Sequence, residues 1–241
     1  MKAVILCAGL GTRLRPLTDT IPKVMVPIGD KPLLQYHIEW LVKNGITDIG
    51  INLFYLPESI VNHFGDGSLF GARIFYSHQK ELLEPATGFK NFEQFVGDDQ
   101  CLVIYGDNIF ELDLNEMRDF HNAKKGIATI ALKEWEDPTT KGIVGLDTNA
   151  QILYFKEKPK KEEVTSTIGN AGIYIIEKEL FDYIPPQEVE VTDFGKHIFP
   201  ALLKKQKAMY GYILKGYHRD IGTHDMLQAA RKEISFYPNL A

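Results

Sequence analysis

Short apolar runs alternate with amphipathic helical patterns through the first half of this 241-residue chain. The runs with the length and apolar character of buried strands are residues 3–6, 49–54, 73–76, 102–105 and 128–132. The helical patterns between them cover residues 32–43, 57–65 and 116–124. Strands that alternate with helices indicate βαβ units. The sequence therefore predicts an α/β fold, with a Rossmann-like mixed, mostly parallel sheet flanked by helices.

The second half has a different pattern, with more strands and fewer helices. Residues 143–146 and 152–155 flank the polar turn 147–150 and predict a hairpin. Further strands are expected at 173–176 and 210–214, and helices at 197–204 and from Thr223, with Met226, Ala230 and Ile234 on one face. No linker rich in Gly, Pro or Ser divides the chain. We expect a single domain over residues 1–241, with a first half of about 1–135 and a hairpin-rich second half of about 136–241.

The overall composition excludes several classes of protein. Hydrophobic residues make up 44% of the chain and charged residues 24%, close to the globular average, which argues against disordered, collagen-like and coiled-coil proteins. Acidic residues outnumber Lys and Arg by 32 to 27, which argues against nucleic acid as the main partner. No apolar run approaches the roughly 18 residues of a membrane span, and no leader precedes the first strand. Cys7 and Cys101 lie in apolar stretches and are expected in the core. We expect a soluble, cytoplasmic protein.

A glycine-rich turn follows the first predicted strand directly. Gly9 and Gly11 would let backbone N–H groups approach phosphate oxygens, and loops at the carboxyl ends of strands bind ligands in open α/β sheets. Leu14 stands where the dinucleotide fingerprint needs a third Gly, and the Gly-Lys-Ser/Thr of a P-loop is missing. The pair of glycines alone is equally compatible with an ordinary tight turn. Basic residues close by favour phosphate binding; they are Arg13, Arg15 and Lys23. The simpler interpretation is that they are solvated surface charges, and Arg15 fits either interpretation equally well.

Two acidic residues are candidate ligands of Mg²⁺. Asp107 follows the predicted strand 102–105, and Asp220 precedes Gly222 and a predicted helix start. Magnesium prefers a few carboxylates together with substrate phosphates and water. Both residues have a simpler interpretation, because Asp is common in turns and Thr223 would then be the helix N-cap.

A charged segment and an asparagine suggest contacts to a hydroxyl-rich ligand. Glu157 could accept hydrogen bonds from sugar hydroxyls, Lys158 could bind a phosphate, and Asn170 offers both a donor and an acceptor. Taken alone, the surrounding KEKPKKEE reads more simply as a solvated loop.

The segment AGLGTRLRPLT, followed by PKVMVPIGDKPLL, resembles the GxGTRxxPxT…PKxxxP signature of the sugar-1-phosphate nucleotidyltransferases. The resemblance implies the nucleotide-diphospho-sugar transferase fold and Mg²⁺-dependent transfer of a nucleoside monophosphate from an NTP to a sugar 1-phosphate, with release of pyrophosphate. It implies catalytic roles for Arg13 and Lys23. The positions that it implies for nucleotide binding are Leu6, Ala8, Gly9, Gly11 and Thr12.

Further segments resemble the same family in the same order. YGDN and YHRDIGT imply that Asp107 and Asp220 hold the metal together, and that Asp107 also contacts the nucleotide. The EKP and NAG motifs and the glycine of KGIVGLD imply a sugar-phosphate site; its residues are Gly142, Glu157, Lys158 and Asn170. Asp193-Phe194 resembles a short helix start near the substrate. The resemblance runs from Lys2 to about Ala230 and leaves no room for the left-handed β-helix that some relatives append.

One segment departs from the family pattern. The family usually carries a stretch like PLGTAGA that reads the base, whereas this chain has EPATGFK, in which Thr87 and Gly88 are expected to fill part of that role. The base therefore stays open, although the preceding stretch resembles the guanylyltransferase and hexose-phosphate branches more than the classical uridylyltransferase branch. Within the family, the chain as a whole resembles the mannose-1-phosphate guanylyltransferases and the glucose-1-phosphate thymidylyltransferases.

Three other functions remain as alternatives. A cytidylyltransferase for phosphocholine or an inositol phosphate would share the glycine loop and differ in its acceptor pocket. A regulatory subunit would bind nucleotide sugars without making them, and a dinucleotide-dependent dehydrogenase is disfavoured by Leu14. The expected partners are the NTP and the sugar phosphate, with no nucleic acid or membrane, and a homo-oligomer is possible.

Overall fold

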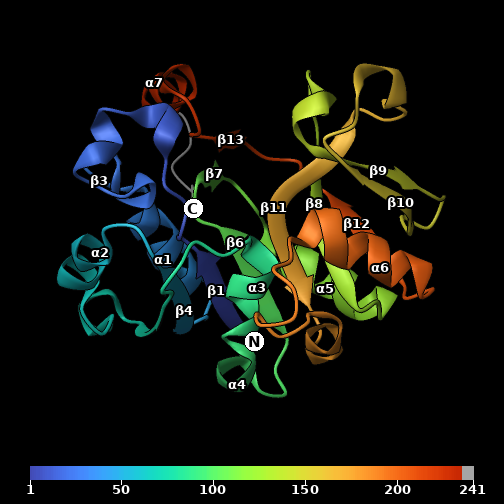
Figure 1. Ribbon diagram of the computed structural model, residues 1–241, viewed down its shortest axis with the longest axis horizontal. Coiled ribbons are helices and arrows are strands. Elements are labelled where there is room, and N and C mark those ends of the chain that lie inside the picture. The colour runs from blue at the N-terminus through green and yellow to red at the C-terminus, as the bar shows by residue number, and fades with distance from the viewer. Residues whose placement is uncertain (235–241) are drawn as a thin grey trace. The chain divides into compact units, whose positions relative to one another are not determined.

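The computed structural model describes residues 1–234 of the chain, and their helices and strands are shown in Figure 1. They form two compact units. Unit 1 comprises residues 1–82, 104–112 and the described residues from 215 onward, and unit 2 comprises residues 83–103 and 113–214. The two expected halves, 1–135 and 136–241, are continuous in sequence, whereas the chain passes repeatedly between these units. The reason is that residues 215–234 pack with the N-terminal strands rather than with the hairpins.

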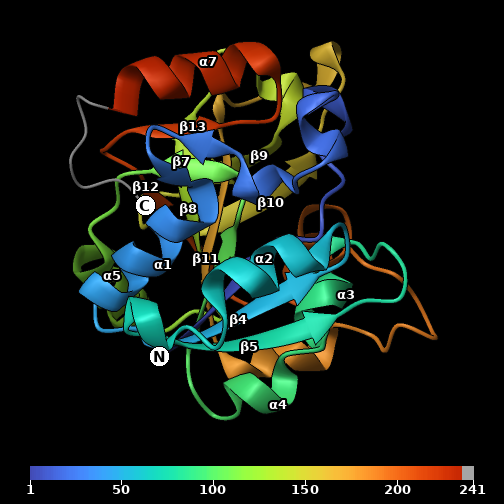
Figure 2. The same ribbon diagram turned by 90° about the vertical axis from the view of Figure 1, so that its left-hand side faces the viewer.

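Unit 1 contains the parallel βαβ arrangement that the alternation predicts. Its strands β1 (Lys2–Leu6), β4 (Asp48–Leu53) and β5 (Arg73–His78) pair in parallel, in that order. The connecting helices are α1 (Leu33–Lys43) and α2 (Pro57–Phe64). Figure 2 shows β4 and β5 side by side, with α2 in front of them. Pro57 opens α2, as predicted, because a first helical residue needs no N–H partner.

Short elements complete unit 1. Strands β2 (Pro27–Ile28) and β3 (Lys31–Pro32) pair antiparallel, as do β7 (Asn108–Phe110) and β13 (His218–Asp220). The 3₁₀ turns are η1 (Thr12–Leu14), η2 (Leu17–Asp19), η3 (Lys23–Met25) and η4 (Ser68–Phe70). Leu14, which stands in place of a third glycine, is fully buried against Ile28 and Ile109 in one core cluster. This side chain therefore anchors the glycine turn to the core.

Helix α7 (His224–Glu233) follows β13, and its start is as predicted. The Oγ1 atom of Thr223 accepts a hydrogen bond from the backbone N–H of Met226, the geometry of an N-cap. The predicted apolar face is wrong at Met226, which is 36% exposed, whereas Leu227 and Ala230 are buried. At 3.6 residues per turn, the buried stripe is centred on Leu227, Ala230 and Ile234, so Met226 falls at its edge.

Unit 2 is built on a mixed sheet. Strand β8 (Ala128–Glu134) pairs antiparallel with β11 (Ile168–Ile176) and parallel with β12 (Met209–Ile213). Strands β9 (Gly142–Leu146) and β10 (Ile152–Glu157) form the predicted hairpin. Strand β6 (Cys101–Tyr105) belongs to unit 2 in its first three residues and to unit 1 in its last two. The α/β fold with a mixed sheet and flanking helices is thus confirmed.

The helices of unit 2 are α3 (Pro85–Lys90), α4 (Glu93–Val96), α5 (Leu114–Lys124) and α6 (Phe199–Lys204). The 3₁₀ segments are η5 (Pro138–Thr140), η6 (Lys161–Glu163) and η7 (Lys178–Tyr183). The helix predicted at 197–204 begins earlier, as the π-helical turn η8 (Phe194–Ile198), which continues into α6. Asp193 caps this turn, so the helix start predicted at Asp193-Phe194 is present.

Both cysteines are buried and free, as expected of small core residues. In the part of the chain that the structure describes, no helix combines the length and the apolar character needed to cross a bilayer.

Candidate functional site

The glycine turn follows β1, and its two glycines differ in the space that surrounds them. Gly11 has a φ of 63°, and a Cβ there would lie 3.0 Å from Thr18 Cγ2 and 3.1 Å from Lys23 Cβ. Only glycine fits such a position without strain. A Cβ at Gly9 would meet nothing within 4 Å. The backbone at Gly9 is therefore exposed to solvent and accessible to a ligand.

Three polar side chains hold this turn through hydrogen bonds, and the sequence analysis did not identify them. We call Asn52, Thr18 and Tyr55 the brace. The buried Asn52, at the end of β4, accepts a hydrogen bond from the Cys7 N–H through Oδ1 at 2.6 Å. Thr18, also buried, donates from Oγ1 to the Gly11 carbonyl at 2.8 Å. Tyr55 Oη in turn donates to the Thr18 carbonyl at 2.8 Å. Burial raises the pKa of the Cys7 thiol, which stays protonated and serves as a core residue.

The other predicted residues of the turn differ in exposure. Leu6 ends β1 and is partly buried, and Ala8 is buried. Both side chains are apolar, so the polar groups that these residues can present to a ligand are those of the backbone. Thr12 and Arg13 are exposed on η1. Arg15 makes an exposed ion pair with Asp19, with Nε 3.2 Å from Oδ1. That contact fits the simpler interpretation of Arg15 as a surface charge.

The two predicted metal ligands are brought together by β7 and β13. Asp220 is the last residue of β13 and pairs with Asn108, and the Ile221 N–H donates to the Asp107 carbonyl at 3.0 Å. Lys23 Nζ lies 2.6 Å from Asp107 Oδ2 and 3.8 Å from Asp220 Oδ1. The Lys23 side chain is only 10% exposed. Two carboxylates that are 113 residues apart in sequence thus converge on one ammonium group.

Arg13 completes this cluster beside Gly222, which the sequence indicated only as a residue before a helix start. A Cβ at Gly222 would lie 2.7 Å from Arg13 Nη2 and 2.6 Å from Asp220 Oδ1. The Arg13 guanidinium and the Asp220 carboxylate therefore both lie against Gly222. A side chain on any larger residue at this position would take up the space that they occupy. The position of Gly222 two residues after Asp220, ahead of a helix N-cap, was the available signal. We call the set Arg13, Lys23, Asp107, Asp220 and Gly222 the aspartate site.

The donor set of the aspartate site suits a hard cation. Carboxylate oxygens are the ligands that Mg²⁺ prefers, and it is commonly held by one or two of them while phosphates and water fill the remaining positions. Residues 1–234 contain no group of three or more His, Cys, Asp or Glu side chains placed to hold a metal. A cation here would accordingly need ligands from a substrate, and the convergence of the two carboxylates on Lys23 shows that positive charge is accommodated between them.

The predicted sugar-side residues lie in unit 2, around Glu157 at the end of β10. Gly142 pairs with Glu157 across the hairpin, and a Cβ at Gly142 would lie 2.5 Å from Glu157 Oε2. Burial raises the pKa of the Glu157 carboxyl, and Asp193 adds to the rise. The opposing effect of Lys158, Lys196 and Lys141 is smaller. The Glu157 carboxylate is thus held in a confined space under lysine charges; of these lysines, Lys141 and Lys196 were not predicted.

Lys158 and Asn170 both lie at irregular points of the backbone. Lys158 is exposed and has a φ of 44°, a left-handed conformation that is uncommon for a side chain other than glycine. Asn170 lies where the pairing of β11 with β8 shifts register. Its Oδ1 accepts from the Gly172 N–H at 2.8 Å, and its Nδ2 donates to Tyr174 Oη at 2.7 Å. Among the described residues 1–234, these two bonds leave one amide proton and one oxygen lone pair of the Asn170 side chain available for a ligand.

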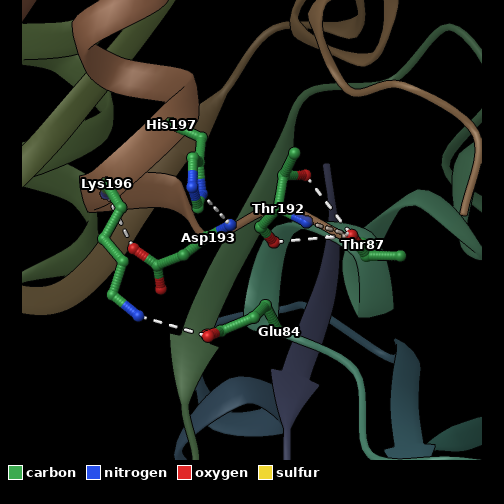
Figure 3. Close-up of polar contacts among 6 residues, drawn as sticks. All are labelled: Glu84, Thr87, Thr192, Asp193, Lys196 and His197. Carbon is green, nitrogen blue, oxygen red and sulfur yellow. Dashed lines mark hydrogen bonds and ion pairs between the residues drawn. The ribbon is translucent and has the colours of Figure 1, made fainter. Parts of the chain in front are cut away.

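Thr87 and Gly88 lie in α3, and both are buried. Figure 3 shows the Thr87 side chain directed at Thr192, across from Asp193, Lys196 and His197. Thr87 Oγ1 accepts a hydrogen bond from the Thr192 N–H at 2.6 Å. The Thr87 hydroxyl therefore has a partner within the protein. Gly195 also lies against Glu157, since a Cβ there would be 2.5 Å from Oε2. We call the set Gly142, Glu157, Lys158 and Gly195 the Glu157 site.

A glycine turn after the first strand of a parallel sheet, beside paired carboxylates and two basic side chains, is typical of phosphate-binding sites in α/β proteins. The chain belongs to the nucleotidyl transferase family, whose model matches residues 2–235.

Two curated relatives show the range of this family. Over 98% of its length the chain is 39% identical to a UTP–glucose-1-phosphate uridylyltransferase of Synechocystis sp., covering 64% of that protein. Over 92% of its length it is 37% identical to a mannose-1-phosphate guanyltransferase of Saccharomyces cerevisiae, covering 61% of that protein. The chain thus spans less than two thirds of the length of either relative.

Two solved structures share the fold. One is described as a glucose-1-phosphate thymidylyltransferase of Bacillus anthracis in complex with a sucrose; it has a TM-score of 0.87 and 29% identity, over 96% of this chain and 94% of that one. The other is a UDP-glucose pyrophosphorylase complexed with UDP-glucose, with a TM-score of 0.84 over 98% of both chains. Its identity of 23% supports likeness of fold alone. The expected family resemblance is therefore confirmed.

Proposed function

We propose that this protein transfers a nucleoside monophosphate from an NTP to a sugar 1-phosphate, giving a nucleotide sugar and pyrophosphate, with Mg²⁺ as the metal. The observation that carries the proposal is the aspartate site, in which Lys23 Nζ lies 2.6 Å from Asp107 and 3.8 Å from Asp220. The relatives are named for such reactions on glucose 1-phosphate and mannose 1-phosphate.

The reaction needs no nucleophile or base from the protein. An oxygen of the sugar 1-phosphate, already ionised at neutral pH, forms a bond to the α-phosphorus of the NTP. The bond from that phosphorus to the oxygen bridging to the β-phosphate breaks, and the electron pair leaves with pyrophosphate. Catalysis then consists of positioning the two phosphates and stabilising the charge that develops on their oxygens.

The residues of unit 1 are assigned to the NTP. Backbone N–H groups at Gly9 and Gly11 would donate to phosphate oxygens, while Arg13 and Lys23 neutralise their charge. Mg²⁺ held by Asp107 and Asp220 would supply further charge neutralisation at the phosphates. The brace from Asn52 and Thr18 keeps the turn in place before the nucleotide arrives.

The residues of unit 2 are assigned to the acceptor. Glu157 would accept hydrogen bonds from sugar hydroxyls, and Lys158 would bind the attacking phosphate. No group within residues 1–234 donates a hydrogen bond to the Glu157 carboxylate. A half-buried carboxylate with unused acceptor capacity suits a hydroxyl-rich ligand. Asn170 contributes its remaining amide proton.

Pyrophosphate release tests this assignment. Each of ATP, CTP, GTP, UTP and dTTP is supplied with glucose 1-phosphate, mannose 1-phosphate, phosphocholine or an inositol phosphate. We expect release with one NTP and a sugar phosphate, and a drop in kcat/KM of at least ~100-fold for Asp107→Asn and Lys23→Ala. Asp119→Asn, an exposed carboxylate on α5, is the matched control.

Other outcomes would each point elsewhere. Full activity of Asp107→Asn and Lys23→Ala would show that their assigned roles are wrong. Turnover of phosphocholine or an inositol phosphate with CTP, without turnover of any sugar phosphate, would identify the cytidylyltransferase alternative. Binding of nucleotide sugars by the wild type without turnover of any pair would identify a regulatory protein.

A further inference from the structure

The start of α3 is fastened to a segment more than 100 residues away in sequence. The N–H groups of Ala86 and Thr87 both donate to the Thr192 carbonyl at 3.1 Å. In return the Thr192 N–H donates to Thr87 Oγ1 at 2.6 Å, and the two threonine hydroxyls lie 3.3 Å apart. Thr87 and Thr192 are each 1% exposed. We call these contacts the threonine clasp.

The clasp fixes the residues that follow Thr192. The Asp193 N–H donates to His197 Nδ1 at 2.9 Å, and Asp193 Oδ1 accepts from the Lys196 N–H at 2.8 Å, which starts η8. Lys196 Nζ lies 3.2 Å from Glu84 Oε1, so a second contact joins η8 to the residue preceding α3 (Figure 3). Segment 192–196 is therefore held at both of its ends to residues 84–87, at the start of α3.

Gly195, the second residue of η8, lies against the Glu157 carboxylate. A Cβ at Gly195 would be 2.5 Å from Glu157 Oε2 and 3.0 Å from Phe155 Cε1. Gly142 approaches the same oxygen from the hairpin, where a Cβ would also be 2.5 Å away. The carboxylate is thus confined between two glycine backbones, one from β9 and one from η8. Movement of η8 would change the space that the carboxylate occupies.

We propose that Thr87 is a positioning residue for the Glu157 carboxylate, acting through the threonine clasp and Gly195. This inference rests on the proposed function, in which Glu157 binds the acceptor. It deepens that function because Thr87, which lies in the segment expected to read the base, is assigned to acceptor affinity. The Thr87 hydroxyl is buried and engaged with Thr192, so it is directed at the protein rather than at a ligand.

Kinetics with both substrates varied separates this role from a nucleotide contact. Thr87→Val keeps the shape of the side chain and removes the acceptor oxygen, so we expect the KM for the sugar phosphate to rise about fivefold while the KM for the NTP stays within about twofold. Thr87→Ser restores the hydrogen bond and most of the affinity. Gly195→Ala is expected to give the same pattern, because the added methyl group displaces the carboxylate directly.

A buried threonine elsewhere in unit 2 serves as the matched control. Thr129→Val also removes a buried hydroxyl, which contacts His121 Nδ1 at 2.7 Å, so we expect a comparable loss of stability. We expect no change in the acceptor KM for this variant. A rise in the NTP KM alone for Thr87→Val would make Thr87 a nucleotide contact and overturn the proposal, as would equal effects of Thr87→Val and Thr129→Val on the acceptor KM.

A second measurement does not depend on turnover. Carbon-13 NMR of the Glu157 carboxyl, assigned by its loss in Glu157→Gln, follows the titration of this group in the ligand-free protein. We expect Thr87→Val and Gly195→Ala both to shift its titration midpoint relative to the wild type, and Thr129→Val to leave it unchanged. An unshifted midpoint in the first two variants would overturn the positioning role whatever the reaction, whereas a wild type without sugar-phosphate turnover would contradict only the proposed function.

Discussion

The aspartate site and the Glu157 site both hold carboxylates beside lysines, but they control the charge differently. In the aspartate site Lys23 Nζ is in direct contact with Asp107, at 2.6 Å. In the Glu157 site burial raises the pKa of the carboxyl, and the nearby lysines only partly offset the effect. There the glycine backbones of Gly142 and Gly195 set the position of the side chain.

This difference suggests different contributions to one reaction. Paired opposite charges respond strongly to a change in charge on a bound phosphate, so the aspartate site is suited to stabilising a transition state. A carboxylate confined by shape is suited to selecting a hydroxyl-rich ligand, which changes binding more than rate. Substitutions in the first site should therefore lower kcat, and substitutions in the second should raise the acceptor KM.

The largest effect is expected from removal of the metal or of a metal ligand. Chelation of divalent ions should abolish pyrophosphate release, and added Mg²⁺ should restore it. Asp220→Asn should lower kcat by about 10²–10³-fold and raise the Mg²⁺ concentration needed for half-maximal rate. Asp225→Asn, an exposed carboxylate on α7, should behave as the wild type. A variant Asp220→Asn with normal kcat and a raised acceptor KM would contradict the division between the two sites.

An intermediate effect is expected at Glu157. Glu157→Gln removes the charge that strengthens hydrogen bonds from hydroxyls, so the acceptor KM should rise about tenfold to a hundredfold with a smaller change in kcat. Initial rates over a range of acceptor concentrations measure both constants. A kcat that falls as far as that of Asp220→Asn would show that the two sites do not differ in this way.

The same carboxyl gives a pH dependence whose sign follows from its raised pKa. As the pH falls through this raised pKa, the wild type should lose acceptor affinity at a higher pH than an ordinary glutamate would allow, and Glu157→Gln should not show the step.

The folded state binds more protons than the unfolded state just above the usual glutamate pKa, so stability falls as the pH rises through that range. Thermal unfolding should accordingly find Glu157→Gln more stable than the wild type at neutral pH.

The smallest effect is expected from the brace behind the glycine turn. Thr18→Val removes the hydrogen bond to the Gly11 carbonyl, so the free energy of unfolding should fall by ~1 kcal/mol and the NTP KM should rise about fivefold. Thr18→Ser keeps the donor and serves as the control. Nucleotide titration without acceptor measures the effect directly. A change confined to the acceptor KM would show that the turn is not part of NTP binding.

Much of the fold and of the aspartate site could be predicted because the signals are local. A buried strand followed by Gly9, Gly11 and Arg13 places basic groups and exposed backbone at a strand end, whatever the rest of the chain does. Asp107 follows β6 in the same way. The meeting of Asp107 with Asp220 depends on the pairing of β7 with β13, which no local pattern encodes.

The Glu157 site was less accessible to sequence reasoning. The interleaved units and the clasp between Thr87 and Thr192 arise from packing between segments distant in sequence. Gly195 directly follows Asp193-Phe194, yet its closeness to Glu157 requires η8 to lie against the hairpin. A polar residue such as Thr87 looks the same in a sequence whether its hydroxyl is directed at a ligand or at the backbone.

The pairing of β7 with β13 also has a consequence for synthesis of the protein. The ribosome makes Asp107 well before Asp220, which emerges 113 residues later. A nascent chain that has reached only residue 214 already contains the glycine turn, Lys23 and Asp107, but it lacks the strand that supplies the second carboxylate. Prematurely terminated chains would therefore have half of the acidic pair, and the complete aspartate site would appear only after translation has passed β13.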